Sequence, residues 1–142
     1  MEVIMKYYKK AKEMMDMNAT EFIGGVSESE VENAMKALSV IFSESYKAFL
    51  VDFGGGDAGG EVIFGITNHQ EDDIVIITQE ERSVGLPKNM VVIGFWSNAF
   101  ICLDTSEMKS GECPVVEVND GEIEVIADTF GKFLYEYLDE ES

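Results

Sequence analysis

A glycine-rich stretch at 54–60 separates two parts of the chain that have different hydrophobic periods. Before it, apolar residues recur every three or four positions, which is typical of helices with one buried face. After it, apolar and polar residues alternate and β-branched residues are frequent, which is typical of strands. Beyond residue 128 the helical spacing returns. This order predicts an α+β fold with a mainly antiparallel sheet of about six strands, flanked by N-terminal helices and a C-terminal helix.

Three helices are predicted before the glycine-rich stretch. The first covers 2–17 and has one apolar stripe opposite a face of lysines; the stripe comprises Val3, Ile4, Tyr7, Tyr8, Ala11, Met14 and Met15. The second covers 28–39 and begins with a capping box, in which the side chains of Ser27 and Glu30 each accept the other's backbone N–H. The third follows the N-cap Ser43 and ends where the glycines begin.

Six strands and one further helix are predicted after the glycines. The strands cover 61–66, 73–78, 90–96, 98–103, 114–118 and 122–127. Ser97-Asn98 and Asn119-Asp120-Gly121 predict tight hairpin turns, because Asn, Asp and Gly accept positive φ. Asp128 and Thr129 cap the last helix, whose inward face comprises Phe130, Phe133, Leu134, Tyr137 and Leu138. The sequence shows no internal repeat or linker, so one domain spanning 1–142 is expected.

The glycine-rich stretch is not expected to bind nucleotide. A phosphate-binding loop closes with Lys followed by Ser or Thr and leads into a helix, whereas 61–66 reads as a strand. Asp57 within the stretch would also repel a phosphate. A flexible connection between helix and strand is therefore expected.

The chain is strongly acidic, with a net charge of −18 from 28 acidic and 10 basic residues. Residues 1–12 carry four lysines and one acid, a charge of +3, which leaves −21 for the remainder. Such a field repels nucleic acid and anionic membranes, so neither is an expected partner, and it attracts basic proteins. Acidity that serves only solubility is the alternative.

A cytoplasmic location is expected. No apolar run reaches the roughly 18 residues of a membrane helix, and four lysines between residues 6 and 12 interrupt what would be the apolar part of a secretory signal. In that compartment Cys102 and Cys113 remain reduced thiols. Packing is their favoured role, because a redox or nucleophilic role requires a nearby base that no motif supplies.

The sequence lacks the motifs that carry catalysis, which predicts a protein that binds a partner, performs no reaction and takes no cofactor. Two cysteines and one histidine do not have zinc-binding spacing, and His69 stands in a polar loop where exposure is expected. The acids at 71–73 lack the spaced ligands and central glycine of a calcium loop, so no metal is expected. An enzyme assembled from scattered acids, with or without a metal, is the less favoured alternative.

Candidate partner-binding residues are mostly acids in predicted loops, which together could form one negative surface. They are Asp57, Glu71, Asp72, Asp73, Glu80, Glu81, Trp96 and Asp104. Trp96 is a candidate interface anchor, although a tryptophan beside a turn more often lies at the edge of the core. Asp104 also has a structural alternative, in which its carboxylate caps the turn at Thr105-Ser106.

Five segments of the chain resemble the SUKH superfamily, which includes bacterial toxin-immunity proteins and a yeast cell-wall assembly regulator. They are 25–31 (GVSESEV), 45–50 (SYKAFL) with the glycines that follow, 99–105 (AFICLDT), 108–117 (MKSGECPVVE) and 126–130 (IADTF). The last three resemble a branch of Bacillus antitoxins. The resemblance covers 22–138, with one departure: Ser43-Glu44 replaces the usual Leu-Pro, so the third helix must be capped differently.

The resemblance implies an immunity protein that binds and neutralises a cognate toxin, in this branch the C-terminal nuclease domain of a secreted toxin. The acidic charge agrees with this, because a nuclease presents a basic surface that an acidic inhibitor can occlude one-to-one. A scaffold of the same fold in regulation or stress signalling is the alternative function. Monomer and dimer are both open, since a strand at the edge of a sheet is able to pair with another copy.

Overall fold

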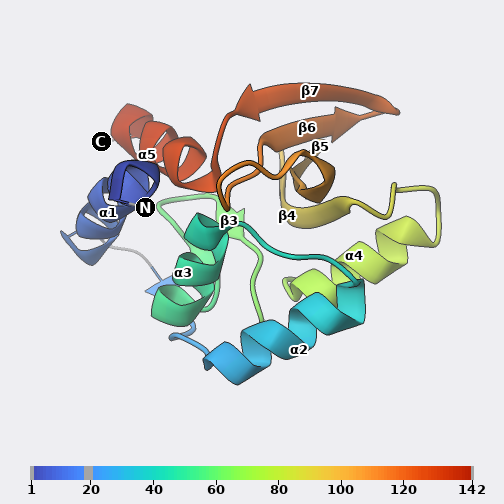
Figure 1. Ribbon diagram of the computed structural model, residues 1–142, viewed down its shortest axis with the longest axis horizontal. Coiled ribbons are helices and arrows are strands. Elements are labelled where there is room, and N and C mark those ends of the chain that lie inside the picture. Colours follow the sequence, from blue (N-terminus) through green and yellow to red (C-terminus); the bar gives the residue numbers. More distant parts are fainter. Residues whose placement is uncertain (1, 18–20, 142) are drawn as a thin grey trace.

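The chain folds into helices and strands in the order expected of an α+β protein (Figure 1). The computed structural model describes residues 2–17 and 21–141, with side chains described for 5–16 and 21–140. The helices are α1 (Glu2–Met17), α2 (Glu28–Leu38), α3 (Glu44–Phe53), α4 (Ile74–Arg82) and α5 (Phe130–Glu141). The strands are β1 (Glu21–Phe22), β2 (Gly56–Asp57), β3 (Val62–Ile63), β4 (Met90–Trp96), β5 (Ala99–Asp104), β6 (Val115–Asn119) and β7 (Glu122–Ala127). A short 3-10 turn, η1 (Thr105–Glu107), follows β5.

The strands form two antiparallel sheets, which confirms the predicted fold class. One sheet has the order β1-β2-β3 and the other the order β4-β5-β6-β7. The strand expected at 61–66 is reduced to the two residues of β3 and belongs to the smaller sheet. The four strands predicted after residue 90 form the larger sheet, with ends that differ from the predicted ones by at most one residue.

The prediction of a strand at 73–78 is wrong, because this segment begins helix α4. Four adjacent β-branched residues at 74–77 do not distinguish a strand from a helix by their spacing. The preceding carboxylate decides the outcome: Asp73 accepts the N–H groups of Val75 and Ile76 at 3.1 and 3.2 Å and so provides the helix N-cap.

The glycine-rich stretch also differs from its prediction, because it supplies β2, the central strand of the smaller sheet. Gly56 pairs with Phe22 on one side and Ile63 on the other. Its φ is +140°, and a Cβ at this position would collide with the carbonyl oxygen of Glu21. Only glycine therefore fits between the two neighbouring strands.

The predicted caps of the second and third helices are confirmed. The Ser27 hydroxyl accepts the Glu30 N–H at 3.1 Å, and the Glu30 carboxylate accepts the Ser27 N–H at 3.2 Å. Ser43 is the N-cap of α3 and accepts the Tyr46 N–H at 3.4 Å. Gly54, with φ of 79°, ends α3 in the left-handed conformation.

Both predicted hairpin turns are confirmed as well. Ser97 and Asn98 join β4 to β5 with φ of 51° and 66°, and Asp120 and Gly121 join β6 to β7 with φ of 50° and 82°. Positive φ at both central residues defines the type I′ turn, whose twist suits a hairpin. The last helix begins as predicted, since the Thr129 hydroxyl accepts a backbone N–H of its first turn at 3.0 Å.

Helix α1 packs along α5 at one side of the molecule (Figure 1). Tyr8 and Met15 of α1 are buried, as the predicted apolar stripe requires. Val3 and Ile4, also assigned to that stripe, lie outside the residues whose side chains are described. In residues 2–17 and 21–141, none of the helices combines the length and apolarity needed to cross a bilayer.

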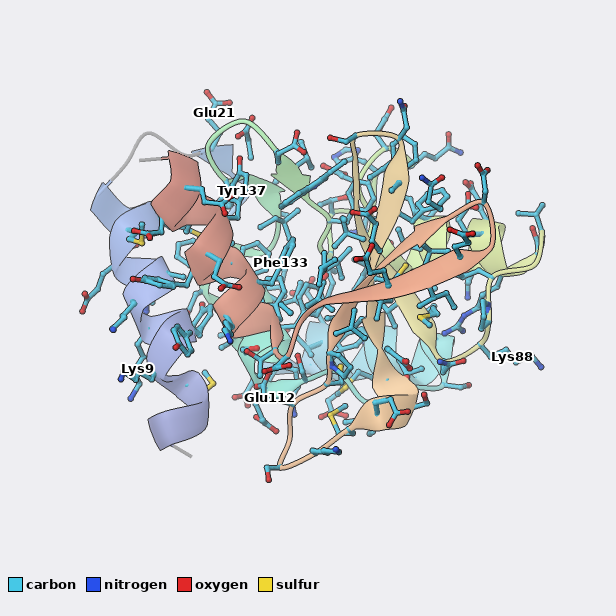
Figure 2. All side chains as sticks on the ribbon, turned by 90° about the horizontal axis from the view of Figure 1, so that it is seen from above. Lys9, Glu21, Lys88, Glu112, Phe133 and Tyr137 are labelled. Carbon is cyan, nitrogen blue, oxygen red and sulfur yellow. The ribbon has the colours of Figure 1, made fainter. Side chains whose placement is uncertain are left out.

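A buried carboxylate joins the starts of α3 and α5. Glu112, which is 5% exposed, accepts the N–H and the hydroxyl of Ser45 at 2.8 and 2.7 Å. The Ser45 hydroxyl in turn accepts the Gly131 N–H of α5 at 3.0 Å, and Figure 2 shows Glu112 near the first turn of that helix. Ser43 and Glu112 together cap α3, which explains how this chain dispenses with the Leu-Pro pair.

Candidate partner-binding surface

One face of the four-stranded sheet carries a row of apolar side chains, one from each strand. In the pairing register Phe95 of β4 lies opposite Phe100 of β5. Phe100 lies opposite Val118 of β6, and Val118 lies opposite Ile123 of β7. The rings of Phe95 and Phe100 are 4.9 Å apart. We call these four residues the apolar row.

The apolar row is open to solvent, most of all at its two ends. Phe95 and Ile123 each remain 50% exposed, and the two middle members are half-buried. The next row along the same face is covered on β4, β5 and β6, where Val92, Cys102 and Val116 are at most 1% exposed, whereas its member on β7, Val125, is 59% exposed. An apolar patch left open beside a covered one is typical of an interaction surface.

A groove separates the apolar row from the segment that follows α4. Val84, Leu86 and Pro87 line its far side, and Glu81 and Asp120 also line it; we call these two acids its acidic rim. Its volume is about 360 Å³. Val84 is 78% exposed, the largest value for a bulky apolar side chain among the described residues. The groove therefore combines apolar walls with an acidic rim.

The opposite face of the β6–β7 hairpin carries carboxylates. Glu117 of β6 lies opposite Glu124 of β7, and Glu122 is on the same face as Glu124 because successive strand residues alternate. The three ion pairs among the described residues are made elsewhere, so these carboxylates lack a basic partner within that part of the chain. Like charges directly opposite each other destabilise a strand pair. A cation from outside would relieve this repulsion.

Both cysteines are free, buried thiols, in agreement with a packing role. Burial raises the pKa of Cys102 to about 12, and the nearby charge of Glu81 adds to the effect. Burial also raises the pKa of Cys113 to about 12, with Glu112 as the next contribution. A thiol with such a pKa stays protonated at neutral pH and is a poor nucleophile.

The candidate contact residues at 71–73 lie just before α4. They differ in whether their carboxylates are used within the fold or stay available to a partner. Asp73 is 4% exposed, and the oxygen that does not cap α4 accepts the Thr67 N–H at 2.9 Å, so this residue is part of the fold. Asp72 accepts the Thr67 hydroxyl. Glu71 is exposed.

The remaining acidic candidates do not join the residues at 71–73 in one cluster. Glu80 and Glu81 lie in the last turn of α4, and a nine-residue helix places them roughly 12 Å from its start. Asp57 lies in the smaller sheet, where its carboxylate accepts the Gly59 N–H at 2.9 Å. Only Glu81 among these acids lies at the rim of the groove.

Trp96 and Asp104 both have structural partners. The ring of Trp96 lies 5.1 Å from Phe133 and 4.9 Å from Tyr137, which Figure 2 shows on the side of α5 that faces the sheet. The indole N–H donates to a carbonyl of β3 at 3.0 Å, so Trp96 lies at the edge of the core. Asp104 caps η1 by accepting the Ser106 N–H at 3.1 Å, as its structural alternative predicts.

Sequence reasoning does not single out the apolar row, because its members alternate with polar residues as in any half-buried strand. Their exposure follows from where α4 ends: the helix stops at Arg82, and the loop beyond it leaves the groove open. The available signal was the pair Val84 and Leu86, two apolar residues in a segment with no predicted element.

The described part of the chain contains no group of three His, Cys, Asp or Glu side chains that could hold a metal ion. His69 is exposed, as expected of a polar loop.

Fold and surface together define the class: a small acidic α+β protein whose open apolar row borders an acidic rim. Comparison with known proteins gives the family. The chain matches the family model SUKH_5, described as SMI1-KNR4 cell-wall, over residues 1–139, and therefore belongs to that family. This confirms the resemblance to the SUKH superfamily, and membership of the family is typical of immunity proteins.

Proposed function

We propose that this chain is an immunity protein that neutralises a toxin by covering a basic surface of the toxin domain. The apolar row supports this most directly, because it is an exposed patch with an acidic rim in a chain of a family typical of immunity proteins.

Binding of such a partner divides into two contributions. Burial of the apolar row and of the groove wall supplies affinity, since apolar surface removed from water contributes about 25 cal/mol per Å². Glu81 and Asp120 at the rim, with the overall charge of −18, select a basic partner and speed its encounter with this face. The exposed acid Glu71 adds to the same field from a position farther away.

A nuclease domain at the C-terminus of a secreted toxin is the partner that fits this charge. The segments 99–105 and 108–117 resemble the Bacillus antitoxin YobK, which supports a toxin partner rather than a regulatory one. Occlusion requires no catalytic residue, because a nuclease is inactive once its basic surface is covered. The complex forms in the cytoplasm, where the toxin would otherwise reach nucleic acid.

Co-expression tests the proposal. A bacterial strain that expresses the toxin domain encoded beside this gene should survive when it also expresses this chain. Ile123→Asn should abolish or weaken the rescue, because it removes apolar contact at the end of the row without changing the charge. Ile41→Asn is the matched control, since Ile41 is 63% exposed in the loop before α3 and does not line this groove.

Rescue by both variants would place the contact elsewhere on the molecule. Absence of rescue by the wild-type chain would favour the alternative function, a scaffold without a toxin partner. The melting temperature of each variant must stay near that of the wild type, so that a loss of rescue reports contact rather than unfolding.

A further inference from the structure

Strand β7 forms a free outer edge of the four-stranded sheet. It pairs with β6 on one side only, and Figure 1 shows it as the outermost strand of that sheet. The opposite edge differs, because the Phe64 N–H donates to the Ile93 carbonyl of β4 at 2.8 Å. In β7 the residues 122–125 are exposed on both faces. Of the two edges, β7 is therefore the one that can accept another strand.

The turn before β7 determines which of its backbone groups face outward. In the type I′ turn at Asp120 and Gly121 the N–H of the fourth residue, Glu122, is directed to β6. Because the direction alternates along an antiparallel strand, Ile123 and Val125 direct their N–H and C=O groups away from the sheet. These two residues offer four backbone hydrogen-bonding groups to an incoming strand.

The side chains of β7 specify what that strand should carry. On the face of the apolar row, Ile123 and Val125 are 50% and 59% exposed. On the other face Glu122 and Glu124 are exposed, and Glu124 lies opposite Glu117 without a basic partner in the described chain. An added strand would place its own side chains alternately beside these two sets.

We propose that β7 binds its partner by strand addition, accepting an extended segment in which apolar and basic residues alternate. The apolar residues extend the apolar row into the partner, and the Lys or Arg residues lie beside Glu122 and Glu124. This proposal rests on the proposed function in naming a basic protein as the partner, and it specifies how such a protein is held. It follows the general mode in which main-chain hydrogen bonds give affinity and alternate side chains give specificity.

A second copy of this chain is the less suitable occupant of the edge. Pairing two copies through β7 would bring Glu122 and Glu124 of each beside those of the other, between molecules that each carry −18. Charged residues on an edge strand normally prevent such self-pairing. A basic segment removes the same obstacle by charge complementarity.

Two fluorescein-labelled peptides test the proposal with the full chain. One alternates four lysines with three valines, and the other contains the same residues as a lysine block followed by a valine block. Fluorescence anisotropy at constant salt should give a Kd for the alternating peptide at least about tenfold lower than for the block peptide. Equal affinities would show that charge alone attracts the peptides, and would overturn the proposal.

Substitutions at one position separate backbone from side-chain effects. Val125→Pro removes an outward N–H that the hairpin does not use, and proline is tolerated on edge strands. It should weaken the alternating peptide at least about tenfold, whereas the control Val125→Thr, which keeps the N–H, should cost less than about threefold. Similar affinities of the two variants would contradict strand addition.

Amide chemical shifts of the wild-type chain provide a readout that does not depend on folding of the proline variant. The alternating peptide should shift the amides of Ile123 and Val125 more than those of Glu122 and Glu124, and the reverse order would contradict the proposal. The experiments also distinguish failure of the toxin proposal from failure of the strand-addition proposal. Toxin binding that Val125→Pro leaves unchanged would remove strand addition alone, and peptide binding without toxin binding would remove the toxin partner alone.

Discussion

At the scale of single residues, the fold depends on a few buried polar groups that satisfy helix ends. Both carboxyl oxygens of Glu112 accept hydrogen bonds from Ser45 in the first turn of α3. The Ser45 hydroxyl in turn accepts the Gly131 N–H of α5. Arg82 has a similar role, donating to the carbonyls of Leu38 and Lys88 at 2.8 and 2.6 Å. Such groups join elements that are far apart in the sequence, so their loss affects more than one helix.

Glu112→Gln is expected to lower the free energy of unfolding by roughly 1–2 kcal/mol, because the amide nitrogen that replaces one carboxyl oxygen cannot accept a hydrogen bond from Ser45. The loss should also depend on pH. Burial raises the pKa of Glu112 more than the hydrogen bonds from Ser45 lower it. The folded state therefore binds this proton more tightly than the unfolded state, and the group stabilises the fold most at or below its ordinary pKa of 4.5.

As the pH rises from 4.5 through the folded pKa of Glu112, that stabilisation is lost. The advantage of the wild type over Glu112→Gln should thus be largest near pH 4.5 and decrease toward neutral pH. Urea unfolding of both proteins across this range measures it. A difference that stays constant with pH would contradict the assigned cause of the shift.

The two thiols should not react in the folded protein. Because Cys102 and Cys113 are buried with a pKa of about 12, a disulfide reagent at pH 8 should modify them at the rate of unfolding. Ellman's reagent with and without denaturant measures the two rates. Rapid modification of either thiol in the native protein would show that its burial is less complete than described.

At the scale of elements, α4 shows why sequence patterns alone are insufficient. The β-branched run at 74–77 predicts a strand, but the N-cap Asp73 and its bonds to the preceding loop produce a helix. The position of the helix end at Arg82 then determines that the groove is open. Because the sequence pattern mispredicts this one helix, it does not reveal the groove that we propose binds the partner.

Asp73→Ala should lower the free energy of unfolding by roughly 2–4 kcal/mol, more than an ordinary N-cap, because four backbone N–H groups lose their acceptor. Thermal or urea unfolding measures the loss. Glu71→Ala is the matched control in the same loop and should change stability by less than about 0.5 kcal/mol. Equal effects of the two substitutions would contradict the capping role of Asp73.

Elements with strong local signals were predictable from the sequence. The capping box at Ser27 and the turn at Asp120-Gly121 each contain residues whose chemistry permits few conformations. The smaller sheet was not predictable, because its two-residue strands depend on contacts between segments distant in the sequence. The same limit applies to the candidate site. Glu81 of α4 and Asp120 of the β6–β7 turn line one groove only because α4 packs against the sheet.

At the scale of the whole molecule, charge is the property that acts at the longest range. The chain carries −18, while the lysines of α1 form a local exception, and Figure 2 shows Lys9 directed away from α5. The acidic remainder includes the groove rim and the face of the β6–β7 hairpin that lies opposite the apolar row. A basic partner is therefore attracted before any contact forms.

The association rate constant with a basic toxin domain should fall at least about tenfold when the salt concentration rises from roughly 0.05 to 0.5 M, because added salt screens the long-range attraction. The dissociation rate constant should change less, since the buried apolar row is insensitive to screening. Stopped-flow fluorescence measures both. An association rate that does not respond to salt would show that charge does not steer the encounter.

Isothermal titration of this chain with a toxin domain encoded by a neighbouring gene would measure the proposed binding itself. We expect one toxin domain to bind per chain with a Kd below about 1 µM, which corresponds to roughly 8 kcal/mol, and nuclease activity to fall in proportion to the bound fraction. Ile123→Asn should weaken this binding and Ile41→Asn should not. A titration that shows no binding at micromolar concentrations would contradict the proposed function.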